Sequence, residues 1–517
     1  MSAEDTDVDM KDVELNEVDQ EKQPMTGGGG GGGGDDGENR DAAEKNGTVN
    51  LKIPADEEVR FTGLSKEELL RVAGTPGWVR TRWALLFLFW LGWVGMLAGA
   101  VVLILQAPRC RDLPTIDWWN HGPLYQIGNI QAFSSTQNLK GVEEKMYNLA
   151  KLKVKGLVVG PVHVAPKEDP MGLRFEEVSS AVGTLEQFKG LVQAAHKASI
   201  SVILDLTPNY QGTRPWFSNV SVTNVAERLK SALVFWLDQG VDGVQLVGVE
   251  HVSSVVPTLW ADIRTIIQNG TEERTSRRVL IGVTERSSAE EVSSLLSSTG
   301  VDLLLSRVLQ SNKDAIEHAQ SIQLLYLAHE QTKLAWNLGS PAGGHLASLD
   351  GPALVKLYQL FLLTLPGTPV FNYGDEIGLG DQSPMMIWDA EEPEELNGTL
   401  KEEREQRRSC LQVFKTLSEL RGKERSLLFG DFLLLFNSTS SLAYLRSWDQ
   451  SERYVAAFNW ASDPVTLDLS HPDLPRQALL VLSTDSDSVA EDAAAVKLTG
   501  LQLGPGHAVL LQFPYSP

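Results

Sequence analysis

Two thiols are the side chains of this 517-residue sequence that are best suited to covalent chemistry. Cys110 follows a long apolar segment, whereas Cys410 lies in a stretch with an apolar helical period. A thiol exposed in an oxidising compartment seeks a disulfide partner, and a cysteine on an apolar helix face packs as a small apolar residue. We therefore interpret Cys110 as the site of an intermolecular disulfide and Cys410 as a core residue. A bond between the two cysteines is the alternative.

Carboxylates at the ends of predicted strands are the second set of candidates. Asp205 and Asn209 follow one predicted strand, and Asp375 and Glu376 follow another. A carboxylate near a strand end more often accepts hydrogen bonds from neighbouring donors than takes part in a reaction. We interpret Asp205 as a structural residue, and Asp375 and Glu376 as loop carboxylates.

The histidines show no pattern typical of metal binding. His163, His251 and His345 are far apart in the sequence and lack the spacing of a metal site. The sequence therefore predicts neither a metal site nor a bound cofactor.

The segment from Trp83 to Leu105 is apolar and contains no ionisable side chain. About 20 apolar helical residues are enough to cross the hydrocarbon layer of a bilayer. A helix of a soluble core would show a polar face, and a cleaved signal would stand at the amino terminus. We therefore predict a single transmembrane helix over residues 83–105.

Two signals predict that the amino terminus is cytoplasmic. Basic residues are more numerous before the apolar segment than directly after it, where Arg109 and Arg111 follow. Acceptor sequons for N-glycans lie downstream of the segment, and the upstream sequon at Asn46 should remain unmodified. The predicted glycosylation sites are Asn219, Asn269, Asn397 and Asn437. The chain is thus predicted to be a single-pass type II glycoprotein with a large carboxy-terminal domain on the outside.

Small residues form a patch on the predicted membrane helix. Gly95 and Gly99 are four residues apart, and Gly92 lies close to them. Such a patch allows a second helix to approach closely, although it also occurs in helices without a partner. We predict that these three glycines pack against a partner helix within the bilayer.

The residues before the membrane helix are strongly acidic. The formal net charge of the chain is −22, and residues 1–60 contain six Lys or Arg against seventeen Asp or Glu. Such a charge excludes nucleic acid as a partner, because a phosphate backbone requires a basic surface. The composition, with a glycine run from Gly27 to Gly34, predicts a disordered cytosolic tail over residues 1–82. It ends in a short juxtamembrane helix with Ser65 as its N-cap.

Beyond a predicted neck at residues 106–122, short apolar runs alternate with helical stretches. Eight such alternations over about 300 residues favour an α/β fold with a closed (β/α)8 barrel of the TIM type at residues 123–425, and a doubly wound sheet is the structural alternative. The predicted strands are Leu124 to Phe133, Gly156 to His163, Ser201 to Thr207, Gly243 to Val249, Val279 to Thr284, Asp302 to Val308, Lys333 to Leu338 and Thr368 to Tyr373.

The last part of the chain, residues 426–517, contains apolar runs without helices between them. Short strands separated by turn residues are typical of an antiparallel β-sandwich. We therefore predict a second, smaller domain that packs on the barrel.

Three motifs resemble those of the α-amylase-type glycoside hydrolases. Residues 365–369 with 373–378 resemble the eighth-strand region of that family, residues 205–210 its third-strand motif, and residues 241–247 its fourth-strand motif. The resemblance covers roughly residues 120–517 and implies a barrel followed by a carboxy-terminal β domain, in agreement with the pattern above.

The reactive residues of that family are not matched. Retaining glycoside hydrolysis needs two carboxyl groups about 5 to 5.5 Å apart. Val247 stands where the fourth-strand motif carries its nucleophilic Asp, with Gln245 in place of its Arg, and Val283 stands where the acid Glu is expected. Glu285 lies two residues beyond Val283 but has no nucleophile to assist, and Asn337-Leu338-Gly339 replaces the seventh-strand motif. We predict no catalytic residue and no enzymatic activity.

The arrangement as a whole resembles one branch of this family, the heavy chains of the heteromeric amino-acid transporters. These solute-carrier heavy subunits have a cytosolic tail, one membrane helix, a neck cysteine and an amylase-like ectodomain. The short connection from Tyr210 to about Thr223 is similar to that of the surface-antigen heavy chains, because it leaves no room for an inserted domain.

The resemblance implies a partner and a function. Cys110 would be disulfide-linked to a multi-span light chain that carries the amino acids, and the heavy chain would stabilise this partner and bring it to the plasma membrane. Association with integrin β chains is also implied. Two other functions stay open at this point, a membrane-anchored α-glucosidase that uses an unrecognised carboxylate such as Glu285, and an adhesion or signalling receptor.

Overall fold

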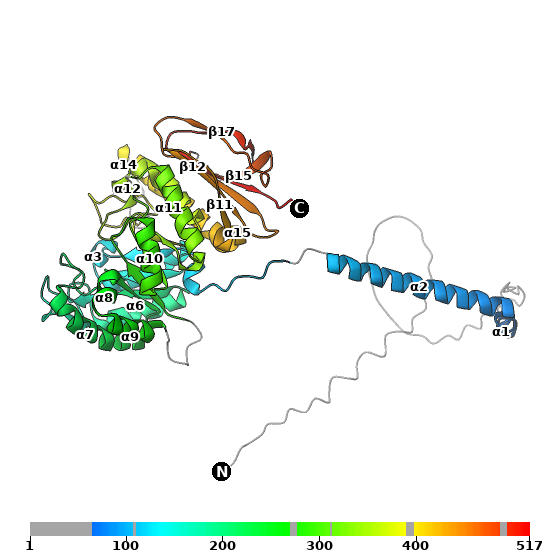
Figure 1. Ribbon diagram of the computed structural model, residues 1–517, viewed down its shortest axis with the longest axis horizontal. Coiled ribbons are helices and arrows are strands. Elements are labelled where there is room, and N and C mark those ends of the chain that lie inside the picture. The colour runs from blue at the N-terminus through cyan, green and yellow to red at the C-terminus, as the bar shows by residue number, and fades with distance from the viewer. Residues whose placement is uncertain are drawn as a thin grey trace, which may run out of the picture. The chain divides into compact units, whose positions relative to one another are not determined.

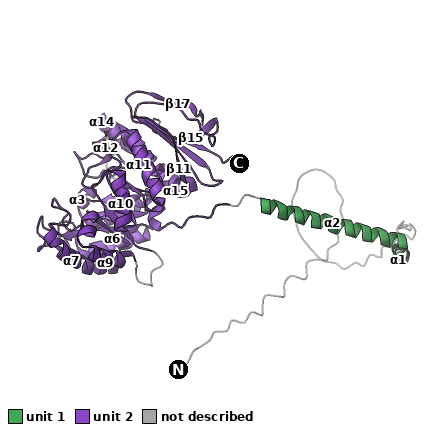
Figure 2. Ribbon diagram, viewed as in Figure 1, with its two compact units in different colours: residues 1–107 green, residues 108–517 purple. Residues whose placement is uncertain are grey.

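The computed structural model describes residues 65–106, 110–268, 277–310, 313–388, 398–485 and 494–516. The chain divides into two compact units, residues 1–107 and residues 108–517, which we describe separately (Figure 2). The greater part of the predicted cytosolic tail, with the sequon at Asn46, lies outside the described residues.

The first unit contains two helices, α1 (Lys66–Ala73) and α2 (Pro76–Gln106). The predicted N-cap of α1 is confirmed, because the Ser65 side chain accepts from the Glu68 N–H and the Glu68 side chain accepts from the Ser65 N–H. Helix α2 is long and apolar enough to cross a membrane, and its apolar window has a mean hydropathy of 2.3. It begins earlier than the predicted span because Pro76 suits the first turn of a helix.

A parallel eight-stranded sheet forms the centre of the second unit, in the order β8-β7-β6-β5-β2-β1-β10-β9. A parallel bridge between Leu304 and Leu334 joins its two ends, so the sheet closes into the predicted barrel and the doubly wound alternative is wrong. The strands are β1 (Leu124–Ile127), β2 (Gly156–Val159), β5 (Ser201–Asp205), β6 (Gly243–Val247), β7 (Val279–Val283), β8 (Leu303–Leu305), β9 (Ala335–Trp336) and β10 (Thr368–Asn372).

Helices follow the strands and cover the outside of the barrel (Figure 1). The helices of the barrel region are α3 (Ile130–Phe133), α4 (Leu139–Glu144), α5 (Met146–Lys151), α6 (Leu185–Lys197), α7 (Asn219–Asp238), α8 (Val249–Val255), α9 (Pro257–Gln268), α10 (Ala289–Thr299), α11 (Ala315–Ala328), α12 (Leu346–Leu349), α13 (Val355–Thr364), α14 (Thr399–Lys423) and α15 (Arg425–Phe429). The hairpin of β3 (His163–Val164) and β4 (Arg174–Val178) lies between β2 and α6.

The first predicted strand is shorter than expected. Strand β1 ends at Ile127, and the Asn129 side chain then accepts from the Ala132 N–H and caps α3. An asparagine that hydrogen-bonds the next turn of backbone competes with the strand, which explains the early end of β1.

Apolar side chains fill the barrel along its axis. The strands contribute these side chains to one cluster, and Trp119 joins it from the neck. The buried members are Trp119, Leu124, Val158, Ile203, Val279, Ile281, Leu303, Leu305, Ala335 and Val370. The barrel is therefore a packed core and not a pore.

A second domain follows the barrel and confirms the predicted sandwich. Its antiparallel six-stranded sheet, in the order β11-β12-β13-β18-β15-β16, packs one face on the barrel, and the two-stranded sheet of β14 and β17 covers the other face. The strands are β11 (Asp431–Asn437), β12 (Ser441–Ser447), β13 (Arg453–Asn459), β14 (Val465–Asp468), β15 (Gln477–Ser483), β16 (Ala495–Lys497), β17 (Thr499–Leu503) and β18 (Ala508–Phe513).

Two buried arginines lie at the end of α13, and one of them, Arg446, joins this domain to the barrel. Arg446 of β12 donates to the carbonyl oxygens of Thr364 and Gly430, at 2.7 and 2.9 Å. Arg421 of α14 donates to the Leu363 carbonyl oxygen at 2.7 Å. These guanidinium groups satisfy backbone acceptors at the end of α13, where an unpaired buried carbonyl would destabilise the fold.

Candidate functional site

The strand ends that would carry reactive residues meet at one face of the barrel. Asp205, Val247 and Val283 are the last residues of β5, β6 and β7. In the register of the sheet, Asp205 pairs with Gln245 and Val247 pairs with Val283. Active sites of barrels of this type lie at the carboxyl ends of the strands. The structure thus brings together the positions that the sequence singled out.

Val283 packs within this face, whereas Val247 contributes backbone hydrogen bonds. Val283 packs against the apolar cluster on the barrel axis. The Val247 carbonyl accepts from the Trp216 indole N–H at 2.8 Å, and the Val247 N–H donates to the Thr207 hydroxyl at 3.1 Å. Neither side chain has an atom that can attack an anomeric carbon or donate a proton.

Asp205 is enclosed in a network of neutral partners. One carboxyl oxygen accepts from the Thr207 N–H and hydroxyl, at 2.8 and 2.6 Å, and the other accepts from the Gln245 amide at 2.9 Å. Gln126 then donates to the Gln245 carbonyl oxygen at 2.8 Å. Burial raises the pKa of Asp205, while these donors act in the opposite direction. Both oxygens are engaged, which supports a structural role.

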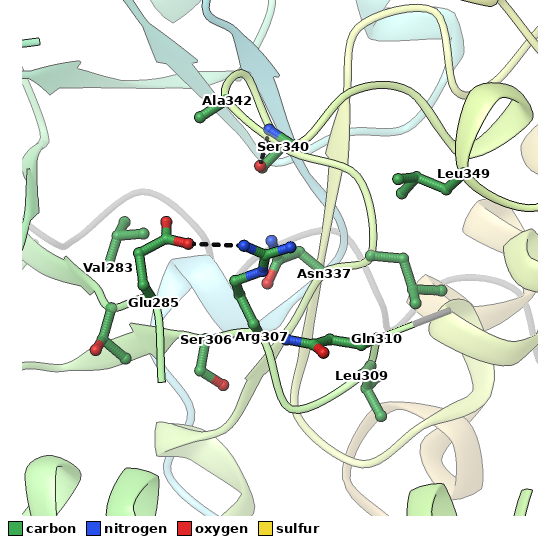
Figure 3. A pocket seen from close by; sticks show the side chains of 13 residues that line it. Val283, Glu285, Ser306, Arg307, Leu309, Gln310, Asn337, Ser340, Ala342 and Leu349 are labelled. Carbon is green, nitrogen blue, oxygen red and sulfur yellow. Dashed lines mark hydrogen bonds and ion pairs between the residues drawn. The ribbon is translucent and has the colours of Figure 1, made fainter. Parts of the chain in front are cut away.

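Glu285 pairs with a cation, and the acid Glu250 lines a second cavity together with it. Glu285 also lines a cavity of about 220 Å³ at the barrel mouth with Arg307, Asn337 and Val283. Its carboxylate pairs with the Arg307 guanidinium at 3.1 Å, and both side chains are more than half exposed (Figure 3). Among the described residues that line this cavity, Glu285 is the only acid. The pair of facing carboxyls that retaining hydrolysis requires is therefore not assembled from these residues.

Asp375 and Glu376 lie in a loop as predicted, but they are buried. Each is 1% exposed in the turn after β10. Asp375 accepts from the Leu346 and Asn372 N–H groups, at 2.9 and 3.0 Å, and burial raises its pKa well above the ordinary value. Glu376 accepts from the Tyr125 hydroxyl at 2.8 Å with one oxygen, and its other oxygen has no partner.

The environment of Glu376 favours its neutral form. Burial raises its pKa to about 7, although nearby backbone N–H groups, the Tyr125 hydroxyl and the charge of Lys415 act to lower it. One feature of the sequence indicated this burial and was missed. The turn that contains Glu376 directly follows strand β10, which is fully buried.

The histidines lie apart in the structure as well. His163 is buried beside Phe175 and Tyr210, and His345 hydrogen-bonds Asp381 at 2.5 Å. Among the residues that the structure describes, no group of three His, Cys, Asp or Glu could hold a metal ion.

The two cysteines differ in exposure. Cys110 is exposed at the start of the neck, while Cys410 is 2% exposed within α14. Within the described part of the chain neither of them forms a disulfide. Cys410 is thus confirmed as a core residue.

The residue after Cys110 is held by the β domain. The Arg111 guanidinium pairs with Asp431 at 2.8 Å and lies over the Trp448 ring, 4.5 Å from its centroid. Its N–H donates to the Asp449 carboxylate at 3.2 Å. These three contacts hold the chain next to Cys110 at the end of the β11–β12 pair where β11 begins and β12 ends.

The neck then reaches the amino-terminal ends of the barrel strands. Asp117 pairs with Arg277 at 2.9 Å, and the Trp118 indole donates to the Arg277 carbonyl oxygen. Asn120 donates to the Thr368 hydroxyl at the start of β10. The neck is therefore docked at the end of the barrel opposite its mouth.

The predicted modification and packing sites that the structure describes are accessible. Asn219 at the start of α7 and Asn437 at the end of β11 are exposed, whereas Asn269 and Asn397 lie outside the described residues. On α2, a Cβ atom added at Gly92, Gly95 or Gly99 would meet no other atom of the described chain within 4 Å.

Comparison with known proteins places these features in a family. Residues 50–125 match the family described as solute carrier family 3 member 2 N-terminus, and residues 132–224 match alpha amylase, catalytic domain. The amino acid transporter heavy chains SLC3A2 of Mus musculus and Oryctolagus cuniculus are each 44% identical to this chain, over 99% of both chains. The chain belongs to the amino acid transporter heavy chains. The heavy chain SLC3A1 of Rattus norvegicus is 24% identical, over 92% of this chain and 90% of its own.

Solved structures of sugar-converting enzymes share the fold of this heavy chain. An inactive double mutant of MutB in complex with isomaltulose has a TM-score of 0.62 at 16% identity, over 77% of this chain and 100% of its own. The alpha-amylase of Geobacillus thermoleovorans in complex with acarbose has a TM-score of 0.58 at 18% identity, over 77% and 99%. The heavy chain itself, as a member of its family, is not an enzyme.

The burial of Glu376 generates a prediction about stability and pH. The pKa of Glu376 is about 7 in the folded chain against an ordinary 4.5, so its contribution to stability is complete below about pH 4.5 and is lost as the pH rises through 7. Between pH 5 and pH 8, the free energy of unfolding of the wild type should fall by about 2 to 3 kcal/mol relative to Glu376→Gln, which mimics the neutral acid.

Chemical denaturation of the full chain at several pH values measures this difference. The exposed acid Glu419 on α14 provides the control, and Glu419→Gln should differ from the wild type by the same amount at each pH. A difference between wild type and Glu376→Gln that does not change with pH would contradict the prediction.

Proposed function

We propose that this heavy chain is a non-catalytic type II glycoprotein of the plasma membrane. It is linked through Cys110 to a multi-span amino-acid exchanger light chain, which it stabilises and brings to the cell surface. Family membership supports the role in amino-acid transport. The exposed Cys110, shortly after an apolar helix that is long enough to span a membrane, supports the covalent link.

The contacts of the neck favour a bond from Cys110 to another chain. Arg111 is held by Asp431, Asp449 and Trp448, so the thiol beside it is presented at one place on the surface. Cys410 is enclosed in α14, and a bond between the two cysteines would require its burial to be disrupted.

Replacement of Cys110 tests the link. In cells that express the heavy chain with its light chain, Cys110→Ser should abolish the high-mass species that non-reducing electrophoresis resolves and that reduction dissociates. Cys410→Ser is the matched control and should leave the species intact, because its side chain is buried. A complex of unchanged mobility in Cys110→Ser would remove the covalent link from the proposal.

The glycines of α2 support a second contact within the bilayer. Gly92, Gly95 and Gly99 lie on one side of the helix and present no side chain, so a partner helix can approach closely. In a Cys110→Ser background, Gly95→Leu should lower co-purification of the light chain several-fold. Leu97→Phe enlarges a side chain near the opposite side of α2 and should have little effect. Equal yields from both variants would argue against this packing face.

Glycosylation tests the proposed orientation. Asn219 and Asn437 are exposed, so Asn219→Gln and Asn437→Gln should each increase the electrophoretic mobility of the mature chain. Enzymatic removal of N-glycans should abolish these differences. Asn46→Gln should not change the mobility, because Asn46 would face the cytosol. A glycan found on Asn46 would reverse the assigned orientation.

The family resemblance also supports association of the ectodomain with integrin β chains. We propose that such an association coexists with the first role and does not depend on the disulfide through Cys110. Immunoprecipitation of integrin β chains from cells that express the Cys110→Ser chain should recover it as well as the wild type, and its absence from both precipitates would remove this association.

A further inference from the structure

A cavity of about 230 Å³ lies outside the barrel strands, between helices α5 and α14 and the segment that follows β10. Its volume is that of roughly eight water molecules in the liquid, so it has room for a small organic molecule. It is separate from the cavity at the barrel mouth, because the two share no lining residue.

Cations predominate among the charged residues that line this cavity. They are Lys151 at the end of α5 and Arg407, Arg408 and Lys415 on α14, in a chain whose formal net charge is −22. Among the described residues of the lining, Glu376 is the only acid, and its carboxyl group is enclosed by protein and does not open onto the cavity. The lining therefore offers positive charge to a ligand and no accessible carboxylate.

Two polar groups of the lining are open to a ligand. The Lys415 ammonium group and the Asn148 side-chain amide form no ion pair and no hydrogen bond with the residues that the structure describes. Both residues are partly exposed. The Lys151 ammonium group differs, because it lies over the Tyr147 ring, 4.2 Å from the ring centroid. One open cation and one neutral amide donor suit a ligand group with a single negative charge, such as a carboxylate.

Apolar side chains form the rest of the wall. Ile377, Met386 and Trp388 line the cavity and are each more than nine-tenths buried. The Trp388 indole N–H donates to the Phe133 carbonyl oxygen at 3.1 Å, which fixes the ring in the wall. Leu411 precedes Lys415 by four residues on α14, so the two side chains lie on one face of that helix. A ligand held at Lys415 can therefore extend an apolar body along this wall.

We propose that this cavity binds a small apolar monocarboxylate, whose carboxylate accepts from Lys415 and Asn148. Its apolar body packs against Leu411, Met386 and Trp388. A neutral molecule of the same shape would leave the ammonium group without a counter-charge, and an amine would add a positive charge to a lining that already carries several. An acid without an apolar body would remove little apolar surface from water.

Such a site depends neither on the disulfide through Cys110 nor on a light chain. Its absence would leave the proposed function of the heavy chain untouched, so the two can fail independently.

Four probes test the chemistry of the ligand. The full-length chain, purified without a light chain and inserted into nanodiscs, is titrated by ligand-observed NMR at neutral pH with 3-phenylpropanoate. The comparison probes are 3-phenylpropan-1-ol, 3-phenylpropylamine and propanoate, which change the charge or remove the apolar body. 3-Phenylpropanoate should bind saturably and each comparison probe at least about tenfold more weakly, because each loses the charge-assisted contact or the apolar burial. Empty nanodiscs measure partition into the lipid.

Variants locate the binding. Lys415→Met should weaken 3-phenylpropanoate about tenfold, and Lys415→Arg, which keeps the charge, should restore most of the affinity. Leu411→Trp fills the cavity and should abolish the titration. Lys401→Met removes a positive charge from an exposed position of the same helix outside the cavity and should bind as the wild type does. Circular dichroism confirms that each variant is folded, and if Leu411→Trp is not, the two Lys415 variants decide.

Three results would overturn the proposal. The first is the absence of saturable binding of 3-phenylpropanoate. The second is an equal affinity for 3-phenylpropan-1-ol, which would show that the cations of the lining do not recognise the ligand. The third is an affinity that Lys415→Met leaves unchanged or that Lys401→Met lowers equally, which would place the binding elsewhere on the chain.

Discussion

A carboxyl group that is enclosed by protein must find hydrogen-bond donors or lose its charge, and this constraint governs the face of the barrel where chemistry would occur. Asp205 meets it fully, with Thr207 and Gln245 supplying donors to both oxygens. Gln245 donates to Asp205 without adding a charge, and its own carbonyl oxygen accepts a hydrogen bond from Gln126. The remnant of an enzyme-like face is thus held together by neutral groups.

At the positions where the related enzymes carry reactive residues, this face has apolar packing and backbone hydrogen bonds. Val283 contributes to the apolar cluster on the axis, and Val247 offers its backbone to Trp216 and Thr207. Clustered acids destabilise a fold because each charge must be compensated, so exchanging them for apolar residues favours stability over activity. The barrel keeps its architecture because most of the residues on its axis and the two arginines at the end of α13 do not involve these two positions.

Much of this could be predicted from the sequence, because the alternation of apolar runs determines strands and helices. The barrel, the sandwich, the membrane-length helix and the capped helix at Ser65 all follow from local patterns. The burial of Glu376 was not predicted, because the position of its turn after an apolar strand gives no information on the packing of α14 and β1 around that turn.

The contacts of the neck could not be predicted from local sequence patterns either. Arg111 meets Asp431 and Asp449 across 320 and 338 residues of sequence, and single exposed charges give no signal of such distant partners. The early end of β1 at Ile127 was missed for the opposite reason, because one short side chain, Asn129, outweighed the strand propensity of the residues around it.

The docking of the neck at the amino-terminal ends of the strands has a mechanical consequence. Tension applied between the neck and any molecule that grips the barrel mouth acts along the eight parallel strands. The hydrogen bonds between strands run across that direction, so the load is shared by many of them in shear and does not peel them apart one after another. The second unit is in this sense stiff along its strands and can transmit a pull without unravelling.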